Sequence, residues 1–215
     1  MSRVDWASVG PPWQVAFDEA WAAFRAGSPP VGAVVVDAGG LVVATGRSRR
    51  GEHTAPANHL SGSRVAHAEI NALAQLDVDQ HVGHELLTTL RPCFLCAAAL
   101  AISHVPHVSF AGDDPMWRFV DGMGDAHPVL AERWYTVSGP MPGPLGTWAA
   151  LLPLVERLAR KPSGTRVDEY LAWAPGLVAL AQDLVADGRW RDLLALDHDA
   201  ALDSLWGELL AAAVA

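Results

Sequence analysis

Apolar, β-rich segments alternate with segments of helical spacing along the first half of this 215-residue chain. Aromatic residues recur at positions 13, 17, 21 and 24, a spacing that predicts a helix over 11–27. The elements predicted after it are a hairpin over 30–46, a helix over 65–76, a strand over 84–90, a helix over 92–105 and a strand over 106–112. Strands that alternate with helices are typical of an α/β fold. We therefore expect an α/β fold around one sheet.

The second half of the chain has a different pattern. Residues 113–144 are irregular and rich in Pro and Gly, whereas residues 145–161 have amphipathic helical spacing despite Pro153. Residues 166–215 are rich in Ala and Leu and should form helices, and residues 161–164 are the best candidate for a linker. We therefore divide the chain into a domain over 1–160 and a helical C-terminal extension over 161–215, packed on that domain or on a second subunit.

The composition is that of a globular protein. Apolar residues make up 51% of the chain and charged residues 18%, which allows a substantial core. The N-terminus has no apolar run of the kind found in signal peptides. Charge or Pro interrupts every apolar stretch before the ~20 residues that a membrane span needs. We therefore expect a cytoplasmic protein with no membrane partner.

The formal net charge of −9 counts against a nucleic-acid partner, because such partners usually require a basic stripe. The main basic cluster is Arg47, Arg49 and Arg50, at the start of a long polar loop over 47–63. Most short basic clusters are solvated, although loops of this length are often functional. An acidic chain with one basic patch suits a small anionic or neutral ligand better than a long polyanion.

The chain has two cysteines, Cys93 and Cys96, directly after Pro92. Two cysteines are too few for a disulfide framework. If they lie on a helix, their spacing of three residues places both side chains on the same side, where they can bind a metal. A helix beginning at Pro92 would place both thiols at its N-terminus, where the helix dipole favours thiolate. The alternatives are a pair of inert buried thiols and a redox-active pair.

His67 and Glu69 fall in the first turn of the helix predicted over 65–76. Positions two apart lie roughly 200° apart around a helix, so these side chains converge only by leaning over its end. Two thiolates and the His67 imidazole make three zinc ligands, which leaves a fourth position for water, as in catalytic zinc sites. Zinc lowers the pKa of that water to about 7. Glu69 beside it can act as a general base and then as a general acid.

His-x-Glu followed by Pro-Cys-x-x-Cys is the signature of zinc-dependent deaminases. Over roughly residues 12–160, the chain resembles the cytidine deaminase superfamily, and most of all the branch of tRNA adenosine, guanine and cytosine deaminases. The segments that carry the resemblance are PPVGAVVV (29–36), AHAEINAL (66–73) and TTLRPCFLCAAALAISHVPHVSFAGDD (88–114). The resemblance implies a three-layer α/β/α sandwich with a central five-stranded mixed sheet, usually in a homodimer.

The resemblance also implies roles for individual residues. It implies Zn²⁺ on His67, Cys93 and Cys96, with Glu69 as the catalytic proton shuttle. The backbone around the remaining motif residues, Ala68, Arg91 and Pro92, is expected to frame the substrate.

The chain departs from the branch around the substrate and not at the metal. Branch members that act on purines commonly have Glu where this chain has Arg91. Many also carry a base-binding Asn after the second strand, where this chain offers Ser48 or, further along the loop, Asn58. The aromatic residues Trp117 and Phe119 are expected either to cover a flat ring or to pack in the core.

The sequence therefore predicts a zinc-dependent hydrolytic deaminase, a hydrolase that acts on C–N bonds of cyclic amidines. The expected substrate is a nucleobase, nucleoside or related amino-heterocycle. Three alternatives remain open: a tRNA adenosine deaminase, an inactive deaminase-like binding protein, and a structural zinc module with a fourth protein ligand.

Overall fold

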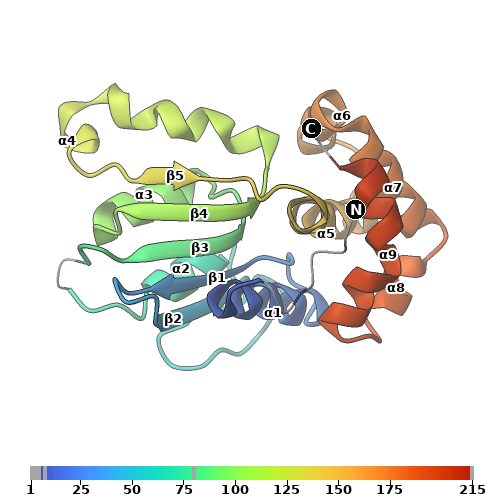
Figure 1. Cartoon of the computed structure of the whole chain (residues 1–215), viewed down its shortest axis with the longest axis horizontal. Helices are drawn as coiled ribbons and strands as arrows, with labels where there is room; N and C mark the ends of the chain where they lie inside the picture. Colours follow the sequence, from blue (N-terminus) through green and yellow to red (C-terminus); the bar gives the residue numbers. More distant parts are fainter. Residues whose placement is uncertain (1–5, 7–8, 79–80, 214–215) are drawn as a thin grey trace.

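The computed structural model, which describes Trp6 and residues 9–78 and 81–213, is a mixed five-stranded sheet with helices on both faces (Figure 1). Its strands are β1 (Gly32–Val36), β2 (Val42–Arg47), β3 (Glu85–Leu90), β4 (His107–Gly112) and β5 (Thr136–Ser138), in the order β2-β1-β3-β4-β5. Strand β1 pairs antiparallel with β2 and β3, whereas β4 runs parallel to β3 and β5. The predicted α/β/α sandwich is confirmed. The predicted outer limits at residues 1 and 215 lie outside the described residues.

Alternate side chains of β1 enter two different cores, because successive residues of a strand point to opposite faces of the sheet. Ala33 and Val35 belong to a core shared with the helices α2 (Ala68–Leu73) and α3 (Phe94–Ser103). Val34 and Val36 pack on the opposite face against the helix α1 (Pro11–Arg25). Both faces of β1 are therefore buried, as its continuous apolar sequence requires.

The fifth strand lies in the segment 113–144, which the sequence predicted to be irregular. This segment contains a 3₁₀ helix η2 (Pro115–Ala126), a short helix α4 (Pro128–Ala131) and then β5. Strand β5 has three exposed residues and pairs only with β4 at the edge of the sheet. So short a strand shows no alternation of apolar residues, so the sequence pattern could not predict it.

The two helices that carry the zinc motif are shorter than predicted. Helix α2 begins at Ala68 and not near 65, and His67 is its N-cap with extended backbone angles. Helix α3 begins at Phe94 and not at Pro92, with Cys93 as its N-cap. Turn hydrogen bonds join residues 63–67 instead of a helical ladder. His67 and Cys93 therefore precede their helices, so the directions of their side chains are not set by the helical repeat.

The C-terminal helices lie together at one end of the molecule (Figure 1). They are α6 (Thr165–Trp173), α7 (Pro175–Ala186), α8 (Arg189–Leu193) and α9 (His198–Ala212), and they share a hydrophobic core with α1 and with α5 (Pro144–Arg160). Within that core, the Trp148 indole donates a 3.1 Å hydrogen bond to Nε2 of buried His198. The extension thus packs on its own chain, while the division at 160/161 stays a prediction.

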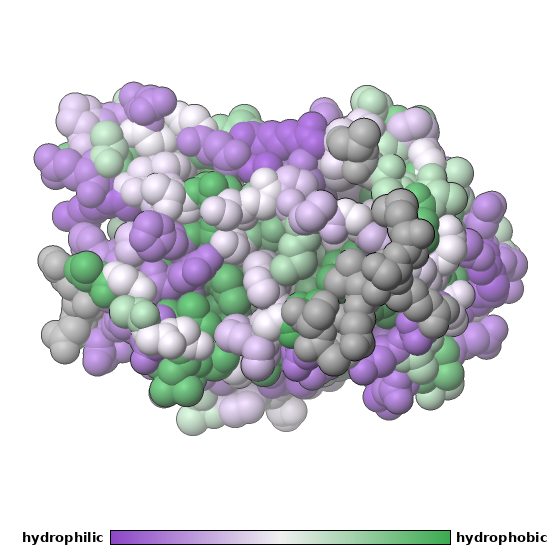
Figure 2. Space-filling model, viewed as in Figure 1, coloured by the Kyte–Doolittle hydropathy of each residue, from purple (hydrophilic) through white to green (hydrophobic). Residues whose placement is uncertain are grey.

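The surface mixes polar and apolar residues. Figure 2 shows hydrophilic residues along the η2–α4 edge of the visible face and around α8, with apolar residues between these areas. Among the described helices, none is long and apolar enough to cross a bilayer.

Asn71, a fully buried residue of α2, holds the long loop against the helix. Its side-chain oxygen accepts a 2.7 Å hydrogen bond from the Leu60 amide. Its side-chain nitrogen donates to the carbonyls of Arg47 at 3.0 Å and Leu60 at 3.2 Å. One side chain therefore fixes both ends of the 47–60 segment to the helix that carries Glu69.

Gly46 of β2 allows α2 to lie directly on the sheet. A Cβ atom at this position would lie 2.3 Å from the Ala68 carbonyl oxygen and 2.5 Å from the Ala72 nitrogen. Both are backbone atoms, so no side-chain rotation could relieve the clash. The absence of a side chain at Gly46 therefore sets the depth of α2, and with it the position of Glu69.

We expect Gly46→Ala to lower the free energy of unfolding by about 1–3 kcal/mol, because overpacking forces the backbone of α2 away from the sheet. Urea unfolding followed by circular dichroism would measure the change. Gly207→Ala is the matched control, since nothing lies within 4 Å of the added Cβ in α9. Equal stabilities for the two variants would contradict the close packing of α2.

We expect Asn71→Ala to lower the free energy of unfolding by on the order of 3 kcal/mol, since it leaves three polar backbone groups without partners. Hydrogen-exchange mass spectrometry should show faster exchange in residues 47–62. Asn58, the other asparagine of the chain, is exposed in a left-handed turn at φ 62°, so Asn58→Gly is the control. Unchanged exchange in Asn71→Ala would show that the loop is held by other contacts.

Candidate metal centre

Three potential metal ligands converge between the N-termini of α2 and α3. Nδ1 of His67 lies 3.5 Å from the sulfur of Cys93 and 3.4 Å from the sulfur of Cys96. The two sulfur atoms are 3.6 Å apart. Within the described ranges, these three residues form the only His, Cys, Asp or Glu cluster with ligand atoms close enough to hold one ion.

The distances fit a tetrahedral zinc ion. With zinc–sulfur bonds of about 2.3 Å and zinc–nitrogen bonds of about 2.0 Å, a tetrahedron places two sulfurs about 3.8 Å apart and sulfur and nitrogen about 3.5 Å apart. The observed separations of 3.4–3.6 Å are close to these values. Two thiols and one imidazole are also a usual donor set for zinc and leave one coordination position open. The three residues therefore fit zinc in both chemistry and spacing.

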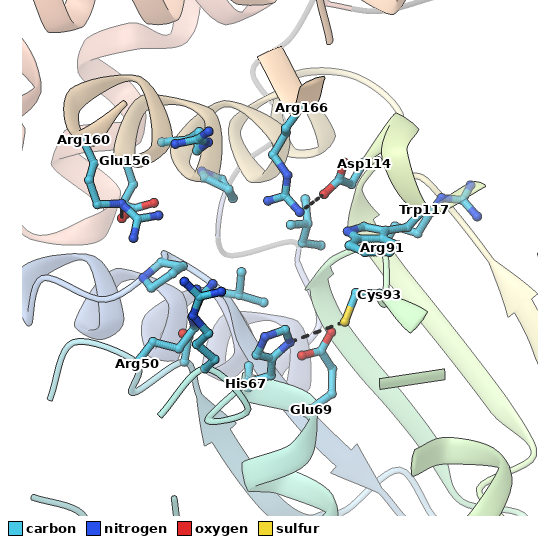
Figure 3. Close-up of a pocket in the computed structure, with 18 residues that line it drawn as sticks. Arg50, His67, Glu69, Arg91, Cys93, Asp114, Trp117, Glu156, Arg160 and Arg166 are labelled. Atoms are coloured by element: carbon cyan, nitrogen blue, oxygen red, sulfur yellow. Dashed lines mark hydrogen bonds and ion pairs between the residues drawn. The ribbon is translucent and has the colours of Figure 1, made fainter. Parts of the chain in front are cut away.

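The helix starts explain how His67 and Glu69 serve one site. His67 is the N-cap of α2, with φ −81° and ψ 158°, so its direction does not follow the helical spacing. Glu69 lies in the first turn of α2 and is 3% exposed. Figure 3 shows both side chains at the base of one cavity, next to Cys93. The two side chains therefore converge although they are only two residues apart.

The environment changes the proton affinities of this group. Burial raises the pKa of the Glu69 carboxyl to about 6. A hydrogen bond with Cys96 lowers the pKa of the Cys93 thiol to about 4, whereas burial raises the pKa of the Cys96 thiol. A carboxyl group whose pKa lies near neutrality can both accept and release a proton, as general acid–base catalysis requires.

A cavity of about 240 Å³ opens beside the three ligands. Six of the predicted site residues are among those that line it: Ser48, His67, Ala68, Glu69, Arg91 and Cys93. Cys96 is fully buried and is not among the lining residues. The other two predicted residues, Pro92 and Asn58, do not line this cavity.

Ser48 and Asn58 were alternatives for a substrate contact, and the structure separates them. Ser48 lines the cavity and is 2% exposed, and its buried hydroxyl has no hydrogen-bond partner among the described residues. Asn58 is exposed and points from a turn that lies outside the cavity lining. The geometry therefore favours Ser48, whose role stays a prediction.

Arg91 lines the cavity, but its charge is already matched inside the protein. Its Nε donates a 2.5 Å hydrogen bond to Asp113, and its Nη1 donates a 2.6 Å hydrogen bond to Asp121. The guanidinium carbon also lies 4.3 Å from the ring centre of Phe110. These contacts fix the side chain of Arg91 and leave its charge balanced by two carboxylates.

The aromatic pair after β4 divides between the cavity and the surface. Trp117 lines the cavity, whereas Phe119 is 61% exposed and does not. Their ring centres are 6.1 Å apart. Trp117 also packs against the core shared by α2 and α3, so it meets both expectations, whereas Phe119 belongs to neither expected environment.

The sequence did not predict the cavity wall opposite the metal ligands. This wall comes from α5 and α6, and its residues are Pro153, Glu156, Arg157, Arg160 and Arg166. Figure 3 shows Glu156, Arg160 and Arg166 facing His67 and Glu69 across the cavity. The amphipathic pattern of 145–161 indicated a helix there, but no motif indicated which of its residues face a ligand.

Comparisons with known proteins agree with this fold and this cluster. Residues 13–112 match the family described as the cytidine and deoxycytidylate deaminase zinc-binding region. The tRNA-specific adenosine deaminase of Aquifex aeolicus is 34% identical over 105 residues, which is 47% of this chain and 64% of that protein. The tRNA(Ile)-lysidine synthase of Deinococcus radiodurans is 31% identical over 109 residues, which is 49% of this chain but only 17% of that protein.

Solved structures show the same fold. A protein solved in complex with 2,6-diaminopurine superimposes with a TM-score of 0.51 and 22% identity, over 72% of this chain and 84% of that chain. The matched residues include His67, Glu69 and both cysteines. Residues 13–112, a little under half of this chain, are thus similar to the zinc-binding region of the cytidine and deoxycytidylate deaminases.

Proposed function

We propose that this chain is a zinc-dependent hydrolytic deaminase of a nucleobase, nucleoside or related amino-heterocycle. The observation that carries the proposal is the cluster of His67, Cys93 and Cys96, with ligand atoms 3.4–3.6 Å apart, beside the buried carboxyl of Glu69 in one cavity. The family match of residues 13–112 to a zinc-binding deaminase region supports it.

The reaction breaks the bond between a ring carbon and its exocyclic amine and forms a carbon–oxygen bond with water. When bound at the three ligands, zinc would supply a coordinated water of lowered pKa, about 7. Glu69 accepts a proton from the attacking water and passes it to the ring nitrogen. It then carries the second water proton to the amine, which leaves as ammonia. Because burial raises the pKa of Glu69 to about 6, this carboxyl exchanges protons readily at neutral pH.

Other residues of the cavity would position the substrate. Ala68 is buried at the first position of α2 and lines the cavity, so a ring can approach the backbone there without meeting a long side chain. The first amides of a helix have no partner within the helix and can bind a ligand carbonyl. We assign Ser48 a polar contact with the substrate, and Arg91 and Pro92 the role of holding the backbone before Cys93.

The structure favours a catalytic over a purely structural zinc site. A structural site needs four protein ligands. The cluster contains three in the described part of the chain, and the cavity lies beside them. A fourth position can therefore be reached by water and substrate.

Two expectations concern the partners of the chain, namely nucleic acid and a second copy of the chain. Relatives named tRNA-specific adenosine deaminases give no support to the expectation against nucleic acid, although the net charge of −9 still disfavours a large polyanion. A homodimer stays a prediction, which sedimentation velocity of the purified chain would test.

We expect one zinc ion per wild-type chain and a loss of at least about 90% of it in Cys96→Ser, because a serine hydroxyl is a poor zinc ligand beside a thiolate. Metal analysis after purification would measure the content. Added zinc should raise the thermal unfolding temperature of the wild type and not that of the variant. Full zinc content in Cys96→Ser would contradict the assigned ligands.

We expect Glu69→Gln to retain zinc and to lower ammonia release by a factor of about 10²–10⁴, because an amide cannot shuttle the proton. Ammonia should be measured over guanine, adenine, cytosine, their nucleosides and the nucleoside 5′-monophosphates. Glu132→Gln, at an exposed carboxylate, is the control. Full activity of Glu69→Gln would refute the mechanism, and zinc-loaded wild type that releases no ammonia would favour a binding protein.

A further inference from the structure

The cavity has a cationic wall in addition to its metal end. Six arginines line the cavity: Arg50, Arg64, Arg91, Arg157, Arg160 and Arg166. Only three carboxylates line it: Glu69, Asp114 and Glu156. Figure 3 shows Arg50, Glu156 and Arg160 together on one side of the cavity, with His67, Glu69 and Cys93 at its base. The whole chain carries a net charge of −9, so this concentration of positive charge is local.

Half of these arginines have carboxylate partners within the protein. The pairs have nitrogen–oxygen distances of 2.5–3.3 Å, and they are Arg91 with Asp113 and Asp121, Arg160 with Glu156, and Arg166 with Asp114. Among the described residues, no carboxylate lies within ion-pair distance of the other three, Arg50, Arg64 and Arg157. Arg157 donates only to the Ser163 carbonyl, at 3.4 Å. The wall therefore has a surplus of positive charge.

Arg50 is the clearest case of this surplus. Its two basic neighbours in sequence, Arg47 and Arg49, both pair with Glu52, so they need no further anion. Arg50 instead lines the cavity, where burial lowers its pKa and the charge of Arg160 lowers it further, only partly opposed by the charge of Glu156. Guanidinium groups held together in a partly buried wall repel one another. An anionic ligand would remove that cost.

Ser48 gives a second, independent indication of a ligand. Ser48 lines the same cavity two residues before Arg50, and its buried hydroxyl lacks a partner in the described structure. Buried polar groups in native proteins are nearly always hydrogen-bonded. A ligand that reaches the unpaired arginines can therefore also satisfy Ser48.

The wall suits a phosphate group on a small molecule. Guanidinium forks match the oxygens of phosphate in geometry and charge. The cavity has a volume of about 240 Å³ and is open to solvent on one side, so a phosphate at the arginine wall can extend beyond it. Arg157 and Arg160 lie in α5 and Arg166 in α6, beyond the residues that match the family. The wall is thus a feature of this chain's own C-terminal half.

We infer that the arginine wall is a phosphate subsite and that the substrate is a nucleoside monophosphate, with its base at the zinc ligands and its phosphate at Arg50 and Arg157. The inference rests on the proposed deaminase function for the position of the base. It assigns a role in substrate binding to α5, which the sequence motifs did not suggest.

Binding to the zinc-loaded Glu69→Gln protein tests the inference without turnover. Isothermal titration calorimetry would compare adenosine, guanosine and cytidine with their 5′-monophosphates. We expect at least one monophosphate to bind about 10–100 times more tightly than its nucleoside, the gain typical of charge-assisted hydrogen bonds. Adding Arg50→Gln and Arg157→Gln should remove most of that ratio and leave nucleoside affinity within about twofold.

Control variants and ligands separate the possible outcomes. Arg133→Gln removes an exposed arginine outside the cavity lining and should leave the ratio unchanged. Equal affinities for nucleosides and monophosphates, or no binding of any monophosphate, would overturn the inference. Tight binding of a short single-stranded oligonucleotide without binding of monophosphates would also overturn it, in favour of a backbone phosphate. Failure of the deaminase proposal appears separately, as absent ammonia release from the wild type.

Discussion

The site depends on the close contact between α2 and the sheet. Gly46 lets the backbone of α2 lie against β2, and Asn71 ties the same helix to the 47–60 loop. This position brings His67, at the start of α2, to the two cysteines at the start of α3. Three ligand atoms can reach tetrahedral spacing because both helices begin at this point. At a helix N-terminus, side chains and free amide groups project beyond the helix. The arrangement of the three ligand atoms therefore depends on how the backbone of α2 packs against β2, away from the ligands themselves.

The C-terminal helices complete the site as well as the core. Tyr170 of α6 donates a 3.2 Å hydrogen bond to the Asp113 carbonyl at the end of β4, and Arg166 lies 3.3 Å from the buried Asp114 carboxylate. These contacts hold the segment that carries Trp117 and fix Asp113 where it pairs with Arg91. Since Arg166 of α6 also lines the cavity, removal of the extension would open the cavity on this side. The extension is thus part of the site and not only a covering of the sheet.

The sequence could predict what is encoded locally. Periodic apolar segments predicted each element up to Gly112, and short spacings predicted the cluster of His67, Cys93 and Cys96. Contacts between distant residues left no such signal: the partners of Asn71 are 11 and 24 residues away, and Arg91 pairs with a carboxylate 30 residues away. Arginines on an amphipathic helix look alike in sequence whether they face solvent or a ligand, so the wall required the packed structure.

Because Arg91 is paired with carboxylates of the protein, other residues must determine which substrate is bound. From the sequence, Arg91 stood out as a departure from the related branch next to the expected substrate position. Two carboxylates and the Phe110 ring instead hold its guanidinium, so a ligand would have to break existing ion pairs to use it. Arg50 and Arg157 need no such exchange, because no carboxylate of the described structure pairs with them. In an acidic molecule, unpaired arginines grouped in one cavity also produce a local positive field that attracts small anions. Discrimination among substrates would therefore depend on the loop after β2 and on α5, while the motif residues around Arg91 keep the metal ligands in place.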